Sequence, residues 1–332
     1  MTAVDAVLEP RIEAFLAERG LEPTVVALSG DASTRRYFRL RGRAGSLVLA
    51  AYPQPFDADS GRFLVIRELF AGYGLRVPAI LDEDLARGIL LLQDLGDRTL
   101  QHVLEAPGEG ERAVLYRDAI ASVVRLQREA ACGPLSAVCF QVAFDIEKLS
   151  WELHYFVKHF VEGLRGCELS VEDRATLSEA IHRLCDEIAS WPRVLCHRDF
   201  HSRNLMLHEK TLFWIDFQDA RMGPATYDLV SLLRDSYVEL AEEFVAERAE
   251  DFRQQALPGE ARDVFARRFE LTSVQRNLKA LGTFGYMKTM RGNEVYLPYV
   301  PRTLALARRN LARYPELSGL RRVLARHIEE LS

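Results

Sequence analysis

Cysteine, long hydrophobic runs and, over much of the chain, lysine are scarce in this sequence. The five cysteines are odd in number and lack CxxC spacing, which argues against a disulfide framework and against a zinc knuckle. No stretch approaches the roughly 18 apolar residues of a membrane-spanning helix, and the N-terminus lacks the cationic and then apolar pattern of a signal peptide. We therefore expect a cytoplasmic protein with reduced cysteines and no membrane partner.

An excess of positive charge is also missing. The 332 residues carry a formal net charge of −5, with 48% hydrophobic and 27% charged residues, as is ordinary for a globular chain. Arginines are interleaved with acids instead of forming one basic stripe, so we expect no nucleic-acid partner. The length suits one large domain or two lobes, and nothing in the sequence indicates an oligomeric state.

The residues with the clearest chemical meaning lie between positions 195 and 228. HRD at 197–199 is followed by four residues and Asn204, and an apolar run then leads to Asp216 in the tripeptide IDF. This is the order of the catalytic loop and of the metal-binding motif in protein kinases. The pattern predicts that Asp199 orients and deprotonates an attacking hydroxyl, while Asn204 and Asp216 hold Mg²⁺ over nucleotide phosphates.

Short apolar runs place these residues at strand ends. Val194–Cys196 leads into the HRD motif and the run TLFWI leads to Asp216, so we expect a short hairpin to present both metal ligands. The alternative is that Asp199 and Asp216 only cap turns. Zinc is disfavoured, because His197 and His201 lack a third soft ligand at a recognisable spacing.

The first part of the chain has the pattern of an antiparallel sheet with two helices. Apolar periodicity predicts a helix that ends near Gly20 and a second helix over 59–73. Turn-forming residues separate β-rich runs, which predict strands at Thr24–Leu28, Arg36–Leu40, Leu47–Tyr52, Ala79–Leu81 and Gly88–Leu92.

In a kinase-like lobe the loop between the first two strands covers the nucleotide phosphates. Here that loop is 30–34, and Arg35 and Arg36 follow it. The third strand, SLVLAAYP, lacks the lysine with which protein kinases grip phosphates, and no lysine occurs in residues 1–147. Arg36 is a candidate replacement, with a solvated edge arginine as the alternative. Gln93 and Leu95 follow the last strand, where a hinge would pair with adenine.

Helical periodicity dominates from Thr99 onward, and four positions there are candidates for contacting the acceptor. Glu152 and His154 lie in an aromatic and polar segment suited to a sugar-like ligand, although aromatic residues at helical spacing are more often core. Lys279 lies on a helix with two further polar residues and could receive a substrate carboxylate or phosphate, with a surface salt bridge as the alternative. Asp219 could bind the acceptor hydroxyl or cap a turn.

Four segments together resemble the aminoglycoside phosphotransferase superfamily, and within it the anomeric N-acetylmuramate/N-acetylglucosamine kinases. They are GDASTRRYFRL, HRDFHSRNLM, VQRNLKALGTF and IDFQDARMGPATYDLVSLLRD. The resemblance implies a kinase-like two-lobed fold and the use of ATP and Mg²⁺ to phosphorylate the anomeric hydroxyl of cell-wall amino sugars during peptidoglycan recycling. It implies that Asp199 is the base, that Asn204 and Asp216 are metal ligands, and that the nucleotide loop contains Ser33, Arg35 and Arg36.

We therefore predict an α+β fold with a small antiparallel-sheet lobe at 1–95 and a mainly helical lobe at 96–332 that carries the catalytic loop. The predicted function is ATP-dependent phosphorylation of a small amino sugar. Kinases of aminoglycosides, choline, homoserine or fructosamine adducts are alternatives within the class. Arginines at 198, 203 and 221 favour a neutral or anionic acceptor. A nucleotide-binding pseudokinase is the alternative from another class, which the missing strand lysine suggests and the intact motif disfavours.

Overall fold

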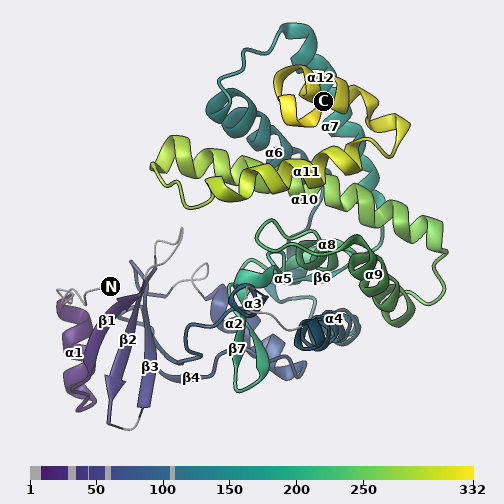
Figure 1. Cartoon of the computed structure of the whole chain (residues 1–332). Coiled ribbons are helices and arrows are strands. Elements are labelled where there is room, and N and C mark those ends of the chain that lie inside the picture. The colour runs from purple at the N-terminus through teal and green to yellow at the C-terminus, as the bar shows by residue number, and fades with distance from the viewer. Residues whose placement is uncertain (1–8, 29–34, 44, 57–60, 105–108) are drawn as a thin grey trace. The chain divides into compact units, whose positions relative to one another are not determined.

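The computed structural model describes residues 9–28, 35–43, 45–56, 61–104 and 109–332. By its internal contacts the chain forms two compact units (Figure 1). The first unit contains residues 1–98 and 206–218, and the second contains 99–205 and 219–332. Contact density defines compact units and not independently folding domains, so the lobe boundary at residue 95 stays a prediction.

An antiparallel sheet of five strands forms the centre of the first unit. In spatial order its strands are β1 (Thr24–Leu28), β2 (Arg36–Gly42), β3 (Gly45–Ala51), β5 (Ile89–Gln93) and β4 (Ile80–Asp84). Each hydrogen-bonded pair of neighbours runs antiparallel. The predicted β-rich runs correspond to these strands, and the antiparallel sheet in the N-terminal part is confirmed.

Helix α1 (Pro10–Glu18) covers part of this sheet with an apolar face. Ile12 and Phe15 are fully buried and belong to one cluster with Phe38 of β2, Leu49 of β3 and Ile89 of β5. Side chains alternate between the faces of a strand, so Phe38 and Leu40 of β2 both reach this cluster. The cluster fixes the register of the strand that begins directly after the predicted phosphate loop.

An aromatic cluster joins helix α2 (Arg62–Gly72) to a second hairpin, β7 (Leu205–His208) and β8 (Thr211–Trp214). Phe63 stacks on Phe217 with ring centroids 5.1 Å apart, and Phe70 contacts both Trp214 and Phe217. The hairpin turn consists of two residues with positive φ, at 209 and 210, as the tightest β-hairpin turns require. Residue 216, one of the predicted metal ligands, is thus placed by the burial of its neighbour Phe217.

Helices make up most of the second unit, as predicted. They are α3 (Leu100–Leu104), α4 (Glu109–Ala130), α5 (Val138–Gln141), α6 (Ile146–Phe156), α7 (Val171–Ser190), α8 (Tyr227–Leu233), α9 (Glu242–Ala256), α10 (Arg262–Arg291), α11 (Val300–Leu311) and α12 (Ser318–His327), and a π-helical segment, η1 (Val157–Leu164), continues α6. Two short strands, β6 (Arg193–Cys196) and β9 (Arg221–Pro224), pair antiparallel. Within the described part of the chain, no helix has the length and apolarity needed to cross a membrane.

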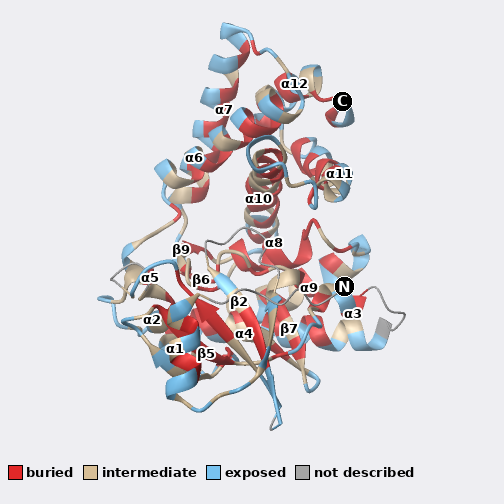
Figure 2. Ribbon diagram, turned by 90° about the vertical axis from the view of Figure 1, so that its left-hand side faces the viewer, coloured by how far each residue is buried: buried red, intermediate tan, exposed pale blue. Residues whose placement is uncertain are grey.

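The core of the second unit lies where α6, η1, α7 and α11 pack against the 30-residue helix α10, whose middle is buried (Figure 2). Two glycines allow α10 to approach its neighbours closely. A Cβ on Gly282 would lie 2.8 Å from Cα of Phe156, and one on Gly285 would lie 2.3 Å from the backbone oxygen of His159. Only a hydrogen fits at either position, so these glycines set the distance between α10 and α6.

Replacing Gly285 with alanine should therefore destabilise the second unit, because backbone atoms must move apart to accept the methyl group. We expect a loss of about 1–3 kcal/mol in the free energy of unfolding, measured by urea denaturation. Gly319→Ala in α12 is the matched control, since its Cβ would meet its nearest neighbour at an ordinary 3.8 Å. Equal stability of the two variants would contradict the close contact between Gly285 and the backbone of His159.

Candidate active site

The HRD motif begins directly after β6, and β6 pairs with β9 instead of the strand TLFWI. The hairpin expected between Asn204 and Asp216 exists, but it is formed by β7 and β8. The strand Val194–Cys196 is not part of it. Sequence analysis did not predict β7, because LMLH is too short and too mixed in polarity to indicate a strand by itself.

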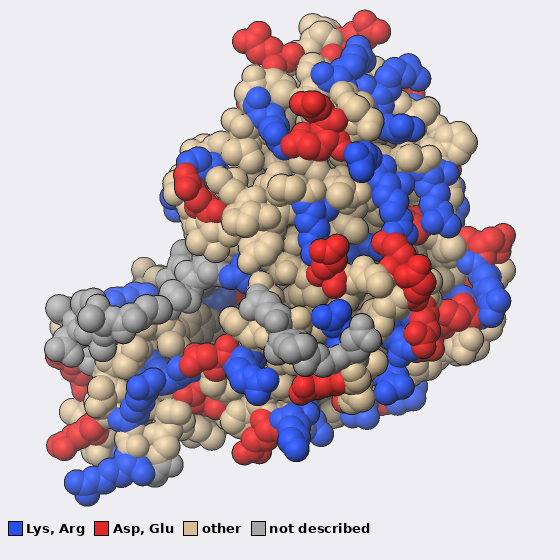
Figure 3. Space-filling model, in the orientation of Figure 1, with Lys and Arg blue, Asp and Glu red and all other residues tan. Residues whose placement is uncertain are grey.

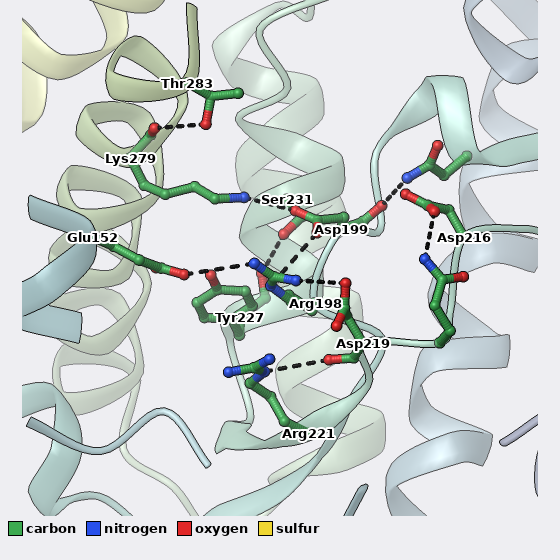
Figure 4. A network of polar contacts seen from close by, with 12 residues as sticks. Glu152, Arg198, Asp199, Asp216, Asp219, Arg221, Tyr227, Ser231, Lys279 and Thr283 are labelled. Atoms are coloured by element: carbon green, nitrogen blue, oxygen red, sulfur yellow. Dashed lines mark hydrogen bonds and ion pairs between the residues drawn. The ribbon is translucent and has the colours of Figure 1, made fainter. Parts of the chain in front are cut away.

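Asp199 lies among three cations of the second unit, and Figure 4 shows two of them, Lys279 and Arg198. Its carboxylate is 2.8 Å from Nζ of Lys279, 3.3 Å from a guanidinium nitrogen of Arg276 and 3.6 Å from Nε of Arg198. Burial alone would raise the pKa of Asp199, but the neighbouring Lys279, Arg198 and Arg276 hold it well below the usual value. The carboxylate is therefore ionised throughout the physiological pH range.

Two buried carboxylates hold the backbone of the loop that carries Asp199. Asp228 of α8 accepts hydrogen bonds from the backbone N–H groups of His197, at 2.6 Å, and Arg198, at 3.0 Å. Asp235 accepts one from the backbone N–H of Ser202 at 2.8 Å. Asp228 therefore braces the start of the catalytic loop. The role of Asp235 was missed, because an aspartate after a helix carries no signal of what it bonds.

The loop also contains an unusual backbone conformation. Arg198 has φ of 88°, and the only other described non-glycine residues with positive φ are Asp216 and the two residues of the β7–β8 turn. Such conformations are costly for residues with a Cβ and concentrate at functional sites. At residue 198 the two bonds from the loop to Asp228 offset this cost and orient the next residue, Asp199.

The two histidines of this loop, His197 and His201, are not arranged to bind zinc. Burial lowers the pKa of His201 to about 3, so the ring is neutral, and His197 is fully buried. Over the described ranges no group of three or more His, Cys, Asp and Glu side chains could hold a metal ion. The zinc alternative therefore has no support among these residues.

Asn204 and Asp216 belong to different compact units, and each has local contacts that orient it. The Asn204 side-chain nitrogen donates a hydrogen bond of 2.9 Å to the backbone oxygen of Asp199. Asp216, whose φ is 63°, accepts a bond of 2.8 Å from the side chain of Gln218. Both supply oxygen donors of the kind that Mg²⁺ prefers.

The candidate acceptor residues have different environments. Glu152 of α6 is buried and accepts a bond of 2.9 Å from Gln275 of α10, and Asp219 pairs with Arg198 at 2.9 Å. Lys279, on the α10 face that bears Arg276, contacts Asp199 as described above. His154 is exposed and lies two positions after Glu152 on the same helix, so the two side chains point in different directions. Glu152, Asp219 and Lys279 thus all lie near Arg198 or Asp199, whereas His154 does not share these contacts.

The candidate nucleotide residues lie in the first unit, except that Ser33 is outside the described residues. Arg36 is exposed and pairs with Glu9 at 3.1 Å. Arg35 lies over the ring of Tyr52 at 5.5 Å and interacts favourably with the charge of Asp216. At the end of β5 the backbone N–H of Gln93 donates to the oxygen of Ala79 at 2.9 Å.

Leu95, the other hinge candidate, is buried, and the residue before it, Asp94, forms a 2.7 Å ion pair with Arg39. Asp94 also accepts a 2.9 Å hydrogen bond from the backbone N–H of Gly96. The segment after β5 is therefore ordered by side-chain contacts within the first unit. No pattern in the sequence indicates the pair of Arg39 and Asp94, since a strand arginine normally faces solvent.

Asp228→Asn should weaken the clamp on the catalytic loop. An amide offers one acceptor oxygen where the carboxylate offers two, so one buried N–H loses its partner at a cost of about 1–3 kcal/mol in the free energy of unfolding. Burial raises the pKa of Asp228 from 3.8 to about 7, so between about pH 4 and pH 7 the folded chain keeps a proton that the unfolded chain has lost. Asp228 thus contributes stability that falls as pH rises across this window, whereas His201, whose pKa burial lowers to about 3, contributes stability that rises with pH. Urea unfolding should therefore show the Asp228 contribution as the difference in pH dependence between the native protein and Asp228→Asn.

In Asp228→Asn that pH-dependent contribution should be absent. The matched control is Asp186→Asn, which changes an exposed aspartate on α7 and should keep the native pH dependence and stability. A native slope in Asp228→Asn would contradict the assignment of the raised pKa to this group.

Comparison with known proteins identifies the family of this chain. The phosphotransferase enzyme family matches residues 24–266. An N-acetylmuramate/N-acetylglucosamine kinase of Neisseria meningitidis serogroup B is 36% identical over 93% of this chain and 91% of the relative. A protein of the same name from Pseudomonas aeruginosa is also 36% identical, over 94% of this chain and 92% of the relative.

Solved structures share the fold at low sequence identity. Aminoglycoside phosphotransferase APH(2'')-Ib, bound to ADP, has a TM-score of 0.60 and 16% identity and covers 90% of this chain and 98% of that chain. Choline kinase LicA from Streptococcus pneumoniae has a TM-score of 0.61 and 14% identity and covers 93% and 100%. The fold predicted from the sequence is confirmed as protein-kinase-like. The chain belongs to the phosphotransferase enzyme family.

Proposed function

We propose that this enzyme transfers the γ-phosphoryl group of ATP to the anomeric hydroxyl of N-acetylmuramate and N-acetylglucosamine, in the cytoplasm and as part of cell-wall sugar recycling. The observation that carries the chemistry is the ionised Asp199 held by three cations at the end of the HRD motif. The acceptor is proposed from the relatives of that name, which match this chain over nearly its whole length.

Asp199 is suited to positioning an acceptor hydroxyl more than to strong base catalysis. Its lowered pKa makes it a weak base, and the transition state of phosphoryl transfer is loose, so the hydroxyl proton leaves late. An anomeric hydroxyl is more acidic than other sugar hydroxyls, because the ring oxygen stabilises the alkoxide. A weakly basic carboxylate that accepts the hydroxyl's hydrogen bond therefore matches this acceptor.

Asn204 and Asp216 are the proposed ligands of Mg²⁺. Asn204 comes directly before β7 and Asp216 follows β8 by two residues, so both leave the same end of one hairpin. One amide oxygen and one carboxylate leave coordination positions for water and phosphate oxygens, which is how Mg²⁺ is usually bound at nucleotides. The metal would neutralise charge on the phosphates during transfer.

Arg35 is the proposed replacement for the missing strand lysine. It interacts with the charge of Asp216, whereas the other candidate, Arg36, is exposed and paired with Glu9. A guanidinium that binds phosphate in a bidentate manner can perform the task of the lysine. We place Ser33, Gln93 and Leu95 at the same nucleotide, as the family resemblance and the position after β5 suggest.

The cations around Asp199 also bear on the alternatives. Aminoglycosides and choline are positively charged, and their sites require an excess of acidic or aromatic groups, whereas here basic groups predominate. A pseudokinase would have no use for an ionised Asp199 on a loop whose backbone is clamped by Asp228 and Asp235. On the face shown in Figure 3, described basic and acidic side chains are interleaved, so the absence of a nucleic-acid partner stays the prediction.

The proposed function is tested by incubating the purified enzyme with ATP, Mg²⁺ and one of four acceptors: N-acetylmuramate, N-acetylglucosamine, choline or kanamycin. We expect ADP and a 1-phosphate with the two amino sugars only. Asp199→Asn should lower kcat by about 10²–10⁴-fold, because it removes the group that orients the hydroxyl, while ATP affinity changes little. Turnover with choline or kanamycin alone, or with no acceptor, would overturn the assignment.

Arg35→Met and Arg36→Met form a matched pair that tests the nucleotide assignment. Each removes one guanidinium from neighbouring positions and keeps a similar apolar stem. We expect Arg35→Met to raise KM for ATP by about tenfold or more and Arg36→Met by less than about threefold, since a charged hydrogen bond contributes roughly 1.5–3 kcal/mol. If Arg36→Met raised KM for ATP more than Arg35→Met, Arg36 would be the residue that replaces the strand lysine.

A further inference from the structure

The basic groups near Asp199 outnumber the acidic ones. Among the residues that interact there, five are basic and four are acidic: Lys148, Arg198, Arg221, Arg276 and Lys279 against Glu152, Asp199, Asp219 and Asp228, and burial raises the pKa of the last. All of these residues belong to the second unit. Unbalanced charge in a partly buried cluster is costly unless an anion completes it.

The pairing distances show which cations carry the excess. Arg198, Arg276 and Lys279 each lie within 3.3 Å of a carboxylate oxygen. Lys148 has only a 3.7 Å approach to Glu152. Within the described residues Arg221 has no carboxylate at ion-pair distance, and its Nε donates to the backbone oxygen of Asp219 at 3.2 Å (Figure 4).

Backbone pairing holds Lys148 and Arg221 on neighbouring segments. The backbone N–H of Phe144 donates to the oxygen of Met222, and the N–H of Met222 donates to the oxygen of Val142, at 2.8 and 3.0 Å. Helix α6, which bears Lys148, begins two residues after Phe144. Arg221 also stacks over the ring of Phe144, at 5.3 Å. The two cations are thus fixed by strand β9 and by the start of α6.

This pair lies beside the catalytic loop. Arg221 is opposite Cys196 in the β6–β9 pairing, and Cys196 is three residues before Asp199. Like charge from Arg198 and Arg221, added to burial, lowers the pKa of Lys148, and burial and Arg198 lower the pKa of Arg221. Each cation would regain stability if an anion approached both.

We propose that Lys148 and Arg221 bind a carboxylate carried by the acceptor sugar, as in the lactyl ether of N-acetylmuramate. The inference rests on the proposed function, because it assigns one part of the acceptor to one part of the same site. A guanidinium and an ammonium beside Phe144 and the half-exposed Trp151 match an anionic group on a short apolar arm. Asp199, Arg276 and Lys279 remain with the reacting hydroxyl and phosphate.

N-acetylmuramate and N-acetylglucosamine form a matched substrate pair, because they differ only in the lactyl group. We expect Lys148→Gln and Arg221→Gln each to lower kcat/KM for N-acetylmuramate by roughly 10- to 100-fold, mostly through KM. The loss for N-acetylglucosamine should be less than about threefold. KM for ATP should not rise in parallel with KM for N-acetylmuramate. Arg221→Lys, which keeps the charge, should recover part of the loss.

Lys158→Gln is the control, since it removes one exposed positive charge from η1, the continuation of α6, and should leave both sugars unaffected. Retained turnover of N-acetylglucosamine shows that a variant is folded. Equal losses of kcat/KM for the two sugars would mean that the cations contact a group that both sugars carry, which would overturn the inference. No loss for either sugar would overturn it as well. A native enzyme that phosphorylates neither sugar would instead overturn the proposed function itself.

Discussion

The ionisation of one partly buried carboxylate is the constraint on which this site depends. Asp199 is partly removed from water, which by itself favours the protonated form, and Lys279, Arg276 and Arg198 reverse that preference. Each of these cations must itself be held in place. Much of the second unit therefore serves to bring charged side chains from α10, the catalytic loop and α6 to one point.

Close helix packing supplies that position. Lys279 and Arg276 lie on α10 and Glu152 lies on α6, and the two helices meet where Gly282 excludes any side chain. The bond between Gln275 and Glu152 then spans the same interface at 2.9 Å. Since buried polar groups are costly without partners, the hydrogen bonds and the packing reinforce each other. The close approach at Gly282 thus helps to place the charged residues of α10 and α6 next to each other.

Backbone clamps give the loop its second constraint. The positive φ of Arg198 is sustained by two hydrogen bonds to Asp228, and Ser202 is held by Asp235. A loop held at both ends presents Asp199 in one orientation, which is what phosphoryl transfer by positioning requires. The surplus of positive charge near Asp199 is the basis of the proposed contact with an anionic group of the acceptor.

The sequence by itself determined the elements of the fold and the chemistry of the motif. Strands such as Thr24–Leu28 are local patterns of apolar residues between turn formers. HRD, Asn204 and Asp216 are recognised by their spacing, because the base and the metal ligands must come from loop positions at set separations along the chain. The membership of the phosphotransferase family followed from the same residues.

Only the tertiary structure decided which distant residues complete the site. Asp235, Arg276 and Lys148 are separated from Asp199 by tens of residues, and no periodicity records that α6, α8 and α10 converge on one loop. The same applies to β6, whose partner proved to be β9, and to Arg35, whose neighbour Asp216 lies far along the chain. Side-chain pairing depends on packing, and packing is set by contacts between elements that the local sequence does not encode.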